Sequence, residues 1–217
     1  MKIALIGATG FVGGAILKEL LDRNHKITAI VRNPGKLKTT HANLSVVEGD
    51  VYDTETLAQT LKGADAVVSA FNAGWTNPNL YADFLKGSQS VQEAVKQAGV
   101  KRLFVVGGGG SLFLENGQQI VDTESFPKDW KEGATAARDY LAILQKETSL
   151  DWTFLSPALE MHQGTSGIRK NEYRTGKDNP VFDEQGRSVI SVEDTAVAIA
   201  DELEQPQFIR SRFTVAY

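Results

Sequence analysis

Three glycines near the start of the chain have the spacing of a phosphate-binding turn. Gly7, Gly10 and Gly13 follow the apolar run at 3–6 and precede apolar residues at helical spacing. The first glycine of such a turn permits a tight bend, the second lets a pyrophosphate approach the backbone, and the third allows close helix packing. The free N–H groups at the helix start then face the phosphates. The pattern predicts a dinucleotide-binding turn, and a glycine-rich turn without a ligand is the alternative.

The second apolar run, at 27–31, ends in cations where a dinucleotide-binding fold contacts the adenosine ribose. Sites that prefer NAD place an acidic residue here to accept a hydrogen bond from the 2′-hydroxyl group. This chain has Arg32 instead, with Lys36 four residues later. A guanidinium group matches a phosphate in both charge and shape. We therefore expect Arg32 and Lys36 to hold the 2′-phosphate of NADP(H), with a solvated surface arginine as the alternative.

Further site residues are expected where later strands end, because open α/β sheets bind ligands at the carboxyl ends of their strands. Asp50 and Val51 follow the apolar run at 44–48. Asp50 either accepts a hydrogen bond from the adenine amino group or is an ordinary loop aspartate. Phe71 and Asn72 follow the next run, at the point where the strand order is expected to reverse. We place all four residues in the predicted cofactor site.

A loop of four glycines begins with Gly107 and Gly108 and ends at Ser111. Either a nicotinamide ribose or substrate approaches this backbone closely, or the loop is simply mobile. Ser111 lacks the strand-turn-helix setting of a hydrolase nucleophile, so we keep it only as a weak catalytic candidate. His162 is the other weak candidate, because it follows a predicted strand. The three histidines are scattered, and their pattern predicts no metal site.

Tyr140 is the side chain that best resembles a proton donor for carbonyl reduction. Many reductases pair such a tyrosine with a lysine four residues later, and the lysine lowers the pKa of the phenol. Here the residue four positions on is Leu144, and Lys146 lies off that helix face. Tyr140 also shares a helical apolar stripe. We predict a core tyrosine, which disfavours carbonyl reduction by a tyrosine-lysine pair.

Composition restricts the classes of partner. The 217 residues include 23 basic and 27 acidic side chains and no cysteine. This balance does not favour nucleic acid or an anionic membrane as a partner, and the chain can form no disulfide or thiolate metal site. No apolar run reaches the length of a membrane span. We therefore expect a cytoplasmic protein that acts on a small molecule, and no pattern specifies its oligomeric state.

The elements that must position these residues alternate between strand and helix, which predicts an α/β fold with a parallel sheet. We expect one domain over 1–217, a loop at 112–131 above the site, and a substrate loop at 158–190 with a small hairpin around 183–186. The predicted strands are 3–6, 27–31, 44–48, 66–70, 103–106, 152–156 and 213–216. The predicted helices are 11–23, 54–62, 80–98, 134–147 and 192–204.

Three stretches together resemble the atypical short-chain dehydrogenase/reductase group of NAD(P)H-binding proteins. They are Gly-Ala-Thr-Gly-Phe-Val-Gly-Gly at 7–14, Asp-Trp-Thr-Phe-Leu-Ser-Pro-Ala at 151–158, and Ile-Ser-Val-Glu-Asp-Thr-Ala-Val-Ala at 190–198. The group includes NADH-flavin reductases, flavin reductases similar to biliverdin reductase B, and NmrA-like regulators. The resemblance implies a Rossmann-type fold with strand order 3-2-1-4-5-6 and a small C-terminal substrate region. The cofactor contacts that it implies are Thr9, Gly10, Phe11, Val12, Arg32, Asp50, Ala70, Phe71 and Pro157.

The resemblance also shapes the expected activity. Flavin reductases of this group need no acid-base pair, which agrees with the missing lysine. Proteins similar to biliverdin reductase B place a histidine after paired prolines, whereas Pro157 is followed here by Ala158 and Leu159, so tetrapyrrole reduction is disfavoured. We expect an NADPH-dependent reductase of a planar acceptor such as FMN, FAD or a quinone. A non-catalytic NADP(H) sensor of the NmrA-like type is the alternative, and a short C-terminal region argues against a nucleotide-sugar epimerase or dehydratase.

Overall fold

The computed structural model describes residues 1–217 and contains one eight-stranded sheet with five helices. The strand order is β3-β2-β1-β4-β5-β6-β8-β7, and each neighbouring pair is parallel except β7 with β8. The strands are β1 (Lys2–Ile6), β2 (Lys26–Val31), β3 (Leu44–Glu48), β4 (Ala66–Ser69), β5 (Arg102–Val106), β6 (Asp151–Pro157), β7 (Arg174–Gly176) and β8 (Ser211–Ala216). The helices are α1 (Phe11–Asp22), α2 (Thr54–Leu61), α3 (Leu80–Gln97), α4 (Lys128–Leu144) and α5 (Val192–Glu204). The predicted Rossmann-type α/β fold is confirmed.

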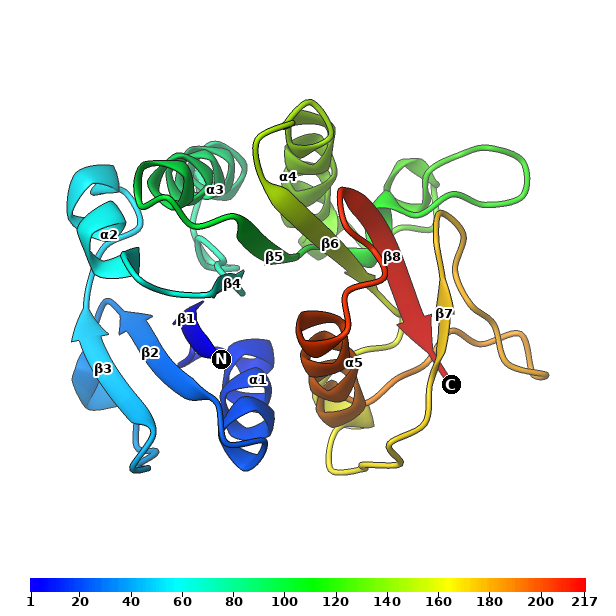
Figure 1. Cartoon of the computed structure of the whole chain (residues 1–217). Helices are drawn as coiled ribbons and strands as arrows, with labels where there is room; N and C mark the ends of the chain where they lie inside the picture. Colours follow the sequence, from blue (N-terminus) through cyan, green and yellow to red (C-terminus); the bar gives the residue numbers. More distant parts are fainter.

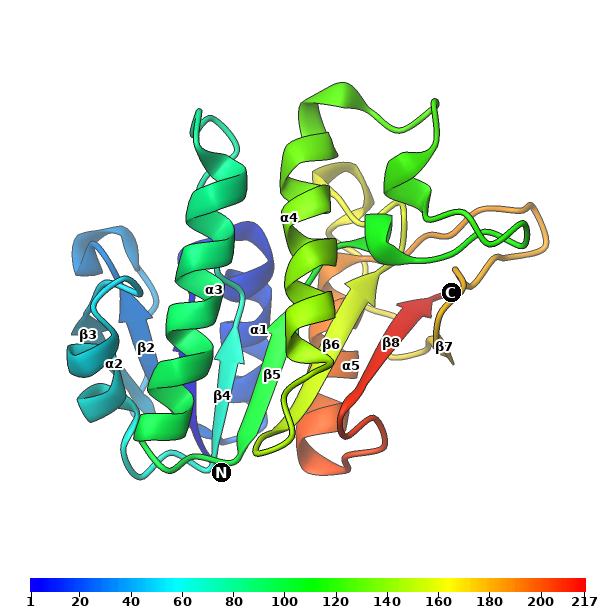
Figure 2. The same ribbon diagram turned by 90° about the horizontal axis from the view of Figure 1, so that it is seen from above.

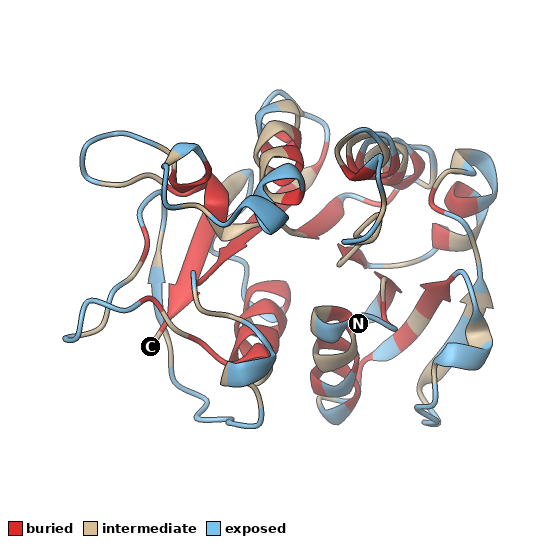
Figure 3. Ribbon diagram, turned by 180° about the vertical axis from the view of Figure 1, so that it is seen from behind, coloured by how far each residue is buried: buried red, intermediate tan, exposed pale blue.

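The helices form two layers, one on each face of the sheet. In Figure 1, α1 and α5 lie below the sheet and α2, α3 and α4 lie above it. Alternate residues of β1 enter different cores: Ile3 and Leu5 join the cluster with α1 and α5, whereas Ala4 and Ile6 join the other. Burial on both faces explains why the strand is continuously apolar. Exposure is concentrated on the outer helix sides and connecting loops (Figure 3). None of the helices has the length and apolar character needed to cross a bilayer.

Two predicted elements differ from the structure. Helix α4 begins at Lys128, not at 134, so part of the predicted loop at 112–131 is helical. Pro127 directly before it is typical of a helix start, but Gly133 and the surrounding charges concealed the first turns. The hairpin predicted around 183–186 is wrong. Asp183 and Arg187 close a tight turn with a 2.8 Å backbone hydrogen bond, but no paired strands flank it.

The chain between β6 and α5 is held mainly by side chains of later elements. Strand β7 pairs only with β8, with Thr175 opposite Val215. Asp194, at the start of α5, accepts the backbone N–H groups of Lys170 and Asn171 at 2.9 and 2.8 Å. The same carboxylate accepts the hydroxyl group of Tyr217 at 2.6 Å. These bonds attach Lys170 and Asn171, which lie outside any helix or strand, to the fold.

Candidate functional site

The candidate site lies where the strand order reverses. From β1 the chain proceeds outward to β2 and β3, and then returns to place β4 on the other side of β1. The loops that leave the carboxyl ends of β1 and β4 therefore diverge to opposite faces of the sheet. At this point Gly7 follows β1 and Ala70 follows β4. The N–H group of Ala70 donates to the carbonyl of Ile6 at 3.0 Å. This is the position at which doubly wound sheets hold dinucleotides.

The three loop glycines differ in how much space the fold leaves for a side chain. A Cβ atom at Gly7 would lie 2.5 Å from the carbonyl oxygen of Ala70, and Gly7 has a φ of +87°. A Cβ atom at Gly13 would lie 2.1 Å from the carbonyl oxygen of Gly7. At Gly10 the nearest atom would be 3.3 Å away. Packing therefore requires glycine at the first and third positions, whereas a Cβ atom at the exposed Gly10 would make one tight contact, with the carbonyl oxygen of Gly7.

Helix α1 begins with unsatisfied donors. Gly10 is its N-cap and supplies no side-chain acceptor, and no acidic residue lies in the first turn. The first backbone bond back into this turn runs from Gly14 to Gly10 at 2.8 Å, so the N–H groups of Phe11, Val12 and Gly13 have no acceptor. Each of the other four helices has a side-chain cap or an acidic residue in its first turn. The donors of α1 and its positive dipole end fit a pyrophosphate.

Cations lie beside this loop at the end of β2. Arg32 and Lys36 are exposed and take part in none of the ion pairs of the molecule. Val31 is in register with Glu48, which brings Arg32 beside the loop that contains Asp50. One Asp50 oxygen accepts the N–H group of Tyr52 at 3.0 Å. Burial, helped by Asp83 and Asp50, raises the pKa of Tyr52, and Arg32 opposes this shift. These unpaired cations suit a 2′-phosphate.

The segment after β4 faces the loop mainly with its backbone. The ring of Phe71 stacks on Phe84 at a centroid distance of 5.9 Å and meets Tyr52 edge-on at 6.2 Å. It therefore points into the core beneath α3, where a Cβ atom at Gly87 would lie 2.5 Å from it. Val51 is also buried in that core. Asn72 accepts the N–H group of Gly74 at 2.7 Å, so the side chains of Val51, Phe71 and Asn72 are all engaged within the fold.

Packing explains most of the four-glycine loop. A Cβ atom would lie 1.9 Å from the Phe154 ring at Gly107, 2.7 Å from the Pro157 carbonyl oxygen at Gly109, and 3.1 Å from Ala134 at Gly110. Gly108 has only an ordinary contact, 3.5 Å from Ala137. Neither ligand approach nor mobility is needed to explain three of these glycines. Gly108 is the position where the loop leaves room for a ligand.

The structure gives the weak catalytic candidates structural partners. Ser111 is fully buried, and its hydroxyl group bonds to the Gly108 carbonyl and to the Ser156 hydroxyl, both at 2.9 Å. His162 is exposed beyond β6, and its Nδ1 accepts the N–H group of Gly164 at 3.0 Å. No group of three or more acidic or histidine side chains could hold a metal ion. The hydroxyl group of Ser111 is thus engaged within the fold, and the His162 ring closes a local turn.

Tyr140 is a core residue, as predicted. Its side chain is 1% exposed and its hydroxyl group donates to Gln92 on α3 at 3.3 Å. Burial, reinforced by the negative charge of Glu147, keeps the pKa of the phenol well above its ordinary value. Tyr140 also lies in the C-terminal part of α4, near the amino ends of the strands. It therefore cannot serve as a low-pKa acid at the carboxyl ends.

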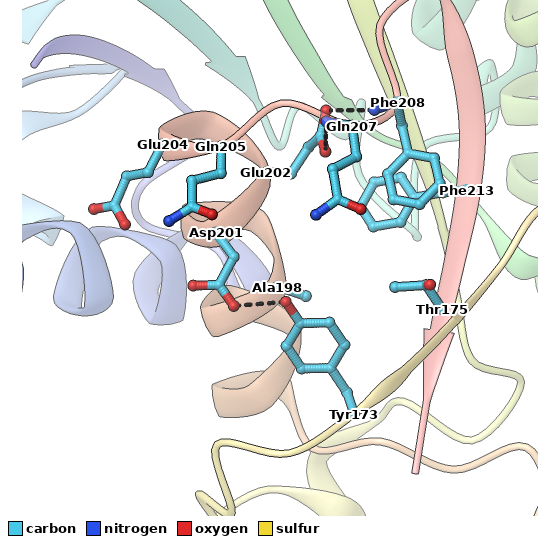
Figure 4. A pocket seen from close by; sticks show the side chains of 10 residues that line it. All are labelled: Tyr173, Thr175, Ala198, Asp201, Glu202, Glu204, Gln205, Gln207, Phe208 and Phe213. Atoms are coloured by element: carbon cyan, nitrogen blue, oxygen red, sulfur yellow. Dashed lines mark hydrogen bonds between the residues drawn. The ribbon is translucent and has the colours of Figure 1, made fainter.

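A cavity of about 350 Å³ lies away from the glycine loop, between α5, β7 and β8 (Figure 4). Its carboxylates are already engaged. Asp201 accepts the hydroxyl group of Tyr173 at 2.5 Å, and Glu202 accepts the N–H groups of Gln207 and Phe208 at 2.8 and 3.1 Å. Burial and the bond to Asp201 raise the pKa of Tyr173. Because these polar groups are satisfied internally, the cavity is a weaker candidate site than the glycine loop.

Two exposed tryptophans near the carboxyl ends of the strands were not among the predicted site residues. Trp75 follows β4 and is 60% exposed, and Trp130 lies in the first turn of α4 and is 52% exposed. Trp130 is three residues before Gly133, which begins the buried stripe of α4. Extending that helical spacing by one step toward the N-terminus would have placed Trp130 on the same stripe.

The chain matches the NAD(P)H-binding family over residues 7–206. It is 40% identical over 217 residues to the uncharacterised protein YwnB of Bacillus subtilis, covering 99% of this chain and 98% of that protein. A candidate epimerase from Bacteroides thetaiotaomicron has a similar structure, with 43% identity, a TM-score of 0.91, and coverage of 100% and 96% of the two chains. A candidate NADH-flavin reductase from Streptococcus pneumoniae has 34% identity, a TM-score of 0.87, and coverage of 100% and 99%. This chain belongs to the NAD(P)H-binding family of atypical short-chain dehydrogenases/reductases.

Proposed function

We propose that the protein is an NADPH-dependent reductase that delivers a hydride to a flavin or quinone. The observation that carries this proposal is the combination of open phosphate donors at α1 with the burial of Tyr140, the tyrosine that best resembles the acid of a tyrosine-lysine pair. A nicotinamide bound at this edge supplies two electrons and one proton as hydride, and solvent supplies the second proton to the planar acceptor. The protein's contribution is to hold donor and acceptor face to face.

The chain's own residues have three roles in this proposal. The N–H groups of Phe11, Val12 and Gly13 bind the pyrophosphate, and Thr9 lies exposed beside them. Arg32, with Lys36, selects the 2′-phosphate. The backbone at Ala70, Phe71, Gly108 and Pro157 forms the floor under the nicotinamide. Asp50 is the residue proposed to meet the adenine, through the oxygen that does not bond to Tyr52.

Reduction of a flavin or quinone fits this chemistry better than epimerisation. One similar structure is named as a candidate epimerase and another as a candidate NADH-flavin reductase. Epimerisation of a sugar by the tyrosine-lysine mechanism requires an accessible phenol, and Tyr140 is buried with a raised pKa. We also propose that the protein acts in the cytoplasm, where reduced nicotinamides are available, and that 158–190 borders the acceptor.

The direct test is NADPH consumption by the purified protein with FMN, riboflavin or menadione as acceptor. We expect saturable turnover with at least one of these acceptors, and slower turnover with NADH at equal concentration. Tight NADPH binding without turnover of any acceptor would contradict the reductase and favour a sensor that binds NADP(H) and signals to a partner. No binding of either nucleotide would contradict both functions.

A further inference from the structure

The apolar stripe of α4 continues past the end of the sheet. The buried residues of this helix recur at helical spacing and are Gly133, Ala136, Ala137, Tyr140, Leu141 and Leu144. Trp130 occupies the next position of the stripe toward the N-terminus, because residues three apart share a helix face. Figure 2 shows the N-terminal turns of α4 extending beyond the arrowheads of β5 and β6. Trp130 therefore belongs to an inward-facing stripe but has no strand beneath it, and it is 52% exposed.

Trp75 reaches the same part of α4 from the loop after β4. A Cβ atom at Gly133 would lie 2.8 Å from Cζ3 of the Trp75 ring and 3.2 Å from Leu80. Glycine inside a helix is unfavourable relative to alanine, and the close approach of this indole explains its presence. Trp75 contacts the position one turn from Trp130, so the two indoles lie on neighbouring parts of one helix face. They are the two most exposed large hydrophobic side chains of the molecule, at 60% and 52%.

We propose that Trp75 and Trp130 form a platform for the planar conjugated ring of the acceptor, an inference that rests on the proposed reductase function. Both indoles flank the carboxyl ends of β4 and β5, whose loops form the predicted nicotinamide floor. An indole offers a rigid aromatic surface, and stacking of planar rings on such side chains tolerates many ring systems. The platform therefore explains a preference for flat acceptors without requiring a hydrogen-bonding pocket for one of them.

Riboflavin fluorescence tests the platform independently of turnover, because stacking on indole quenches the flavin. Wild-type protein with saturating NADP⁺ should quench riboflavin saturably. Trp75→Ala and Trp130→Ala should each weaken this binding about tenfold or more, whereas Trp75→Phe and Trp130→Phe should retain most of it. Both side chains are more than half exposed, so the variants should remain folded by circular dichroism.

Ile209→Ala is the control, because Ile209 is 39% exposed but lies just before β8, at the amino ends of the parallel strands and away from the proposed platform. It should leave riboflavin binding unchanged. In turnover assays, the two alanine variants should raise the KM for FMN, riboflavin and menadione and leave the Kd for NADPH within about twofold. A similar loss with all three acceptors, which present an isoalloxazine or a naphthoquinone ring, supports a platform that recognises planarity, and a loss confined to FMN would overturn it.

The outcomes separate this proposal from the proposed function. Turnover that is unaffected in Trp75→Ala and Trp130→Ala would overturn the platform and leave the reductase standing. Quenching that both alanine variants abolish, in a protein without turnover, would support the platform and overturn the reductase. Concentration-dependent dimers that dissociate in Trp130→Ala, with riboflavin binding unchanged, would assign the indoles to a contact between protein copies and overturn the proposal.

Discussion

Helices α1 and α5 pack against each other on one face of the sheet, but their N-termini are built in opposite ways. At α5, Ser191 accepts the N–H group of Asp194 at 3.0 Å, and two acidic residues lie in the first turn. At α1, Gly10 offers no side chain and no acidic residue follows. Helix α5 satisfies its own donors and dipole, whereas α1 leaves both for an external anion.

The difference shows why the glycine-rich motif at 7–14 and the acidic motif at 190–198 have different roles. The motif at 190–198 is structural, because its buried Asp194 holds Lys170, Asn171 and Tyr217. The motif at 7–14 leaves polar groups without partners and therefore has binding capacity. Two helices of similar length in one protein can thus be distinguished by which N–H groups of their first turns already have acceptors.

The largest expected effect comes from giving α1 an N-terminus that, like that of α5, satisfies its own donors. Gly10→Asp would place a capping carboxylate where the pyrophosphate is expected, and the extended backbone at Gly10, with φ −83° and ψ 169°, accommodates it. Like charges in contact cost several kcal/mol, so the Kd for NADPH should rise on the order of a thousandfold, about 4 kcal/mol. Calorimetric titration measures this change.

The fold should survive Gly10→Asp, because aspartate is a favourable N-cap. Gly13→Ala is the comparison variant: its Cβ atom would meet the Gly7 carbonyl oxygen at 2.1 Å, so its melting temperature should fall. If Gly10→Asp kept its affinity for NADPH, the phosphates would have to bind elsewhere than at α1.

The reverse change removes the internal anion from α5. Asp194→Ala would leave the hydroxyl group of Tyr217 and two backbone donors without their acceptor, and Asp194 is fully buried. We expect the free energy of unfolding in urea to fall by about 2–4 kcal/mol. The Kd for NADPH should change less than about threefold at a temperature where the variant is folded. A large loss of affinity with unchanged stability would refute the structural role.

Arg32→Ala sharpens the contrast at the adenosine end of the site. Hydrogen bonds to a charged group are worth about 1.5–3 kcal/mol, so the Kd for NADPH should rise roughly ten- to a hundredfold. The Kd for NADH, which lacks the 2′-phosphate, should change little. Added salt should shrink the wild-type preference for NADPH, because Arg32 is exposed. Equal losses for both nucleotides, or a wild-type preference for NADH, would remove Arg32 as the phosphate reader.

The smallest expected effect comes from Tyr140→Phe. The variant loses one 3.3 Å hydrogen bond to Gln92 and keeps the buried ring. NADPH turnover should stay within a few fold, and the free energy of unfolding should change by about 1 kcal/mol or less. A thousandfold loss of turnover in a folded variant would restore Tyr140 as a catalytic acid.

The fold was largely predictable because apolar runs and glycines report strand burial and turns directly. The parallel strand order and the bounds of α5 and β3 agree with the sequence predictions. The site was less predictable, because a residue type does not reveal where its side chain points. Phe71 was expected at the cofactor, but its ring packs on Phe84. Likewise, the ring of Phe154, which lies far away in the sequence, leaves no space for a side chain at Gly107.

Trp130 illustrates a different limit of the sequence. Gly133 interrupts the helix propensity of the first turns of α4, and the close approach of Trp75 and Leu80 explains it. A contact between residues so distant along the chain leaves no periodic signal. Because this packing is long-range, the sequence patterns predicted neither the start of α4 nor the exposed indole of Trp130.

The position of β8 between β6 and β7 has a consequence for the order in which the chain can fold. Strands β1 to β5 each find a neighbour soon after they are synthesised, since βαβ units are local. Strand β7 has no partner until 211–216 are available, and Lys170 and Asn171 have no acceptor until Asp194 follows. Strands β1 to β5 can therefore pair while the segment at 158–190, which we propose to border the acceptor, is still unanchored. During synthesis, the strand that leads into the glycine loop can therefore pair before 158–190 is fixed, whereas the packing of α1 against α5 comes last.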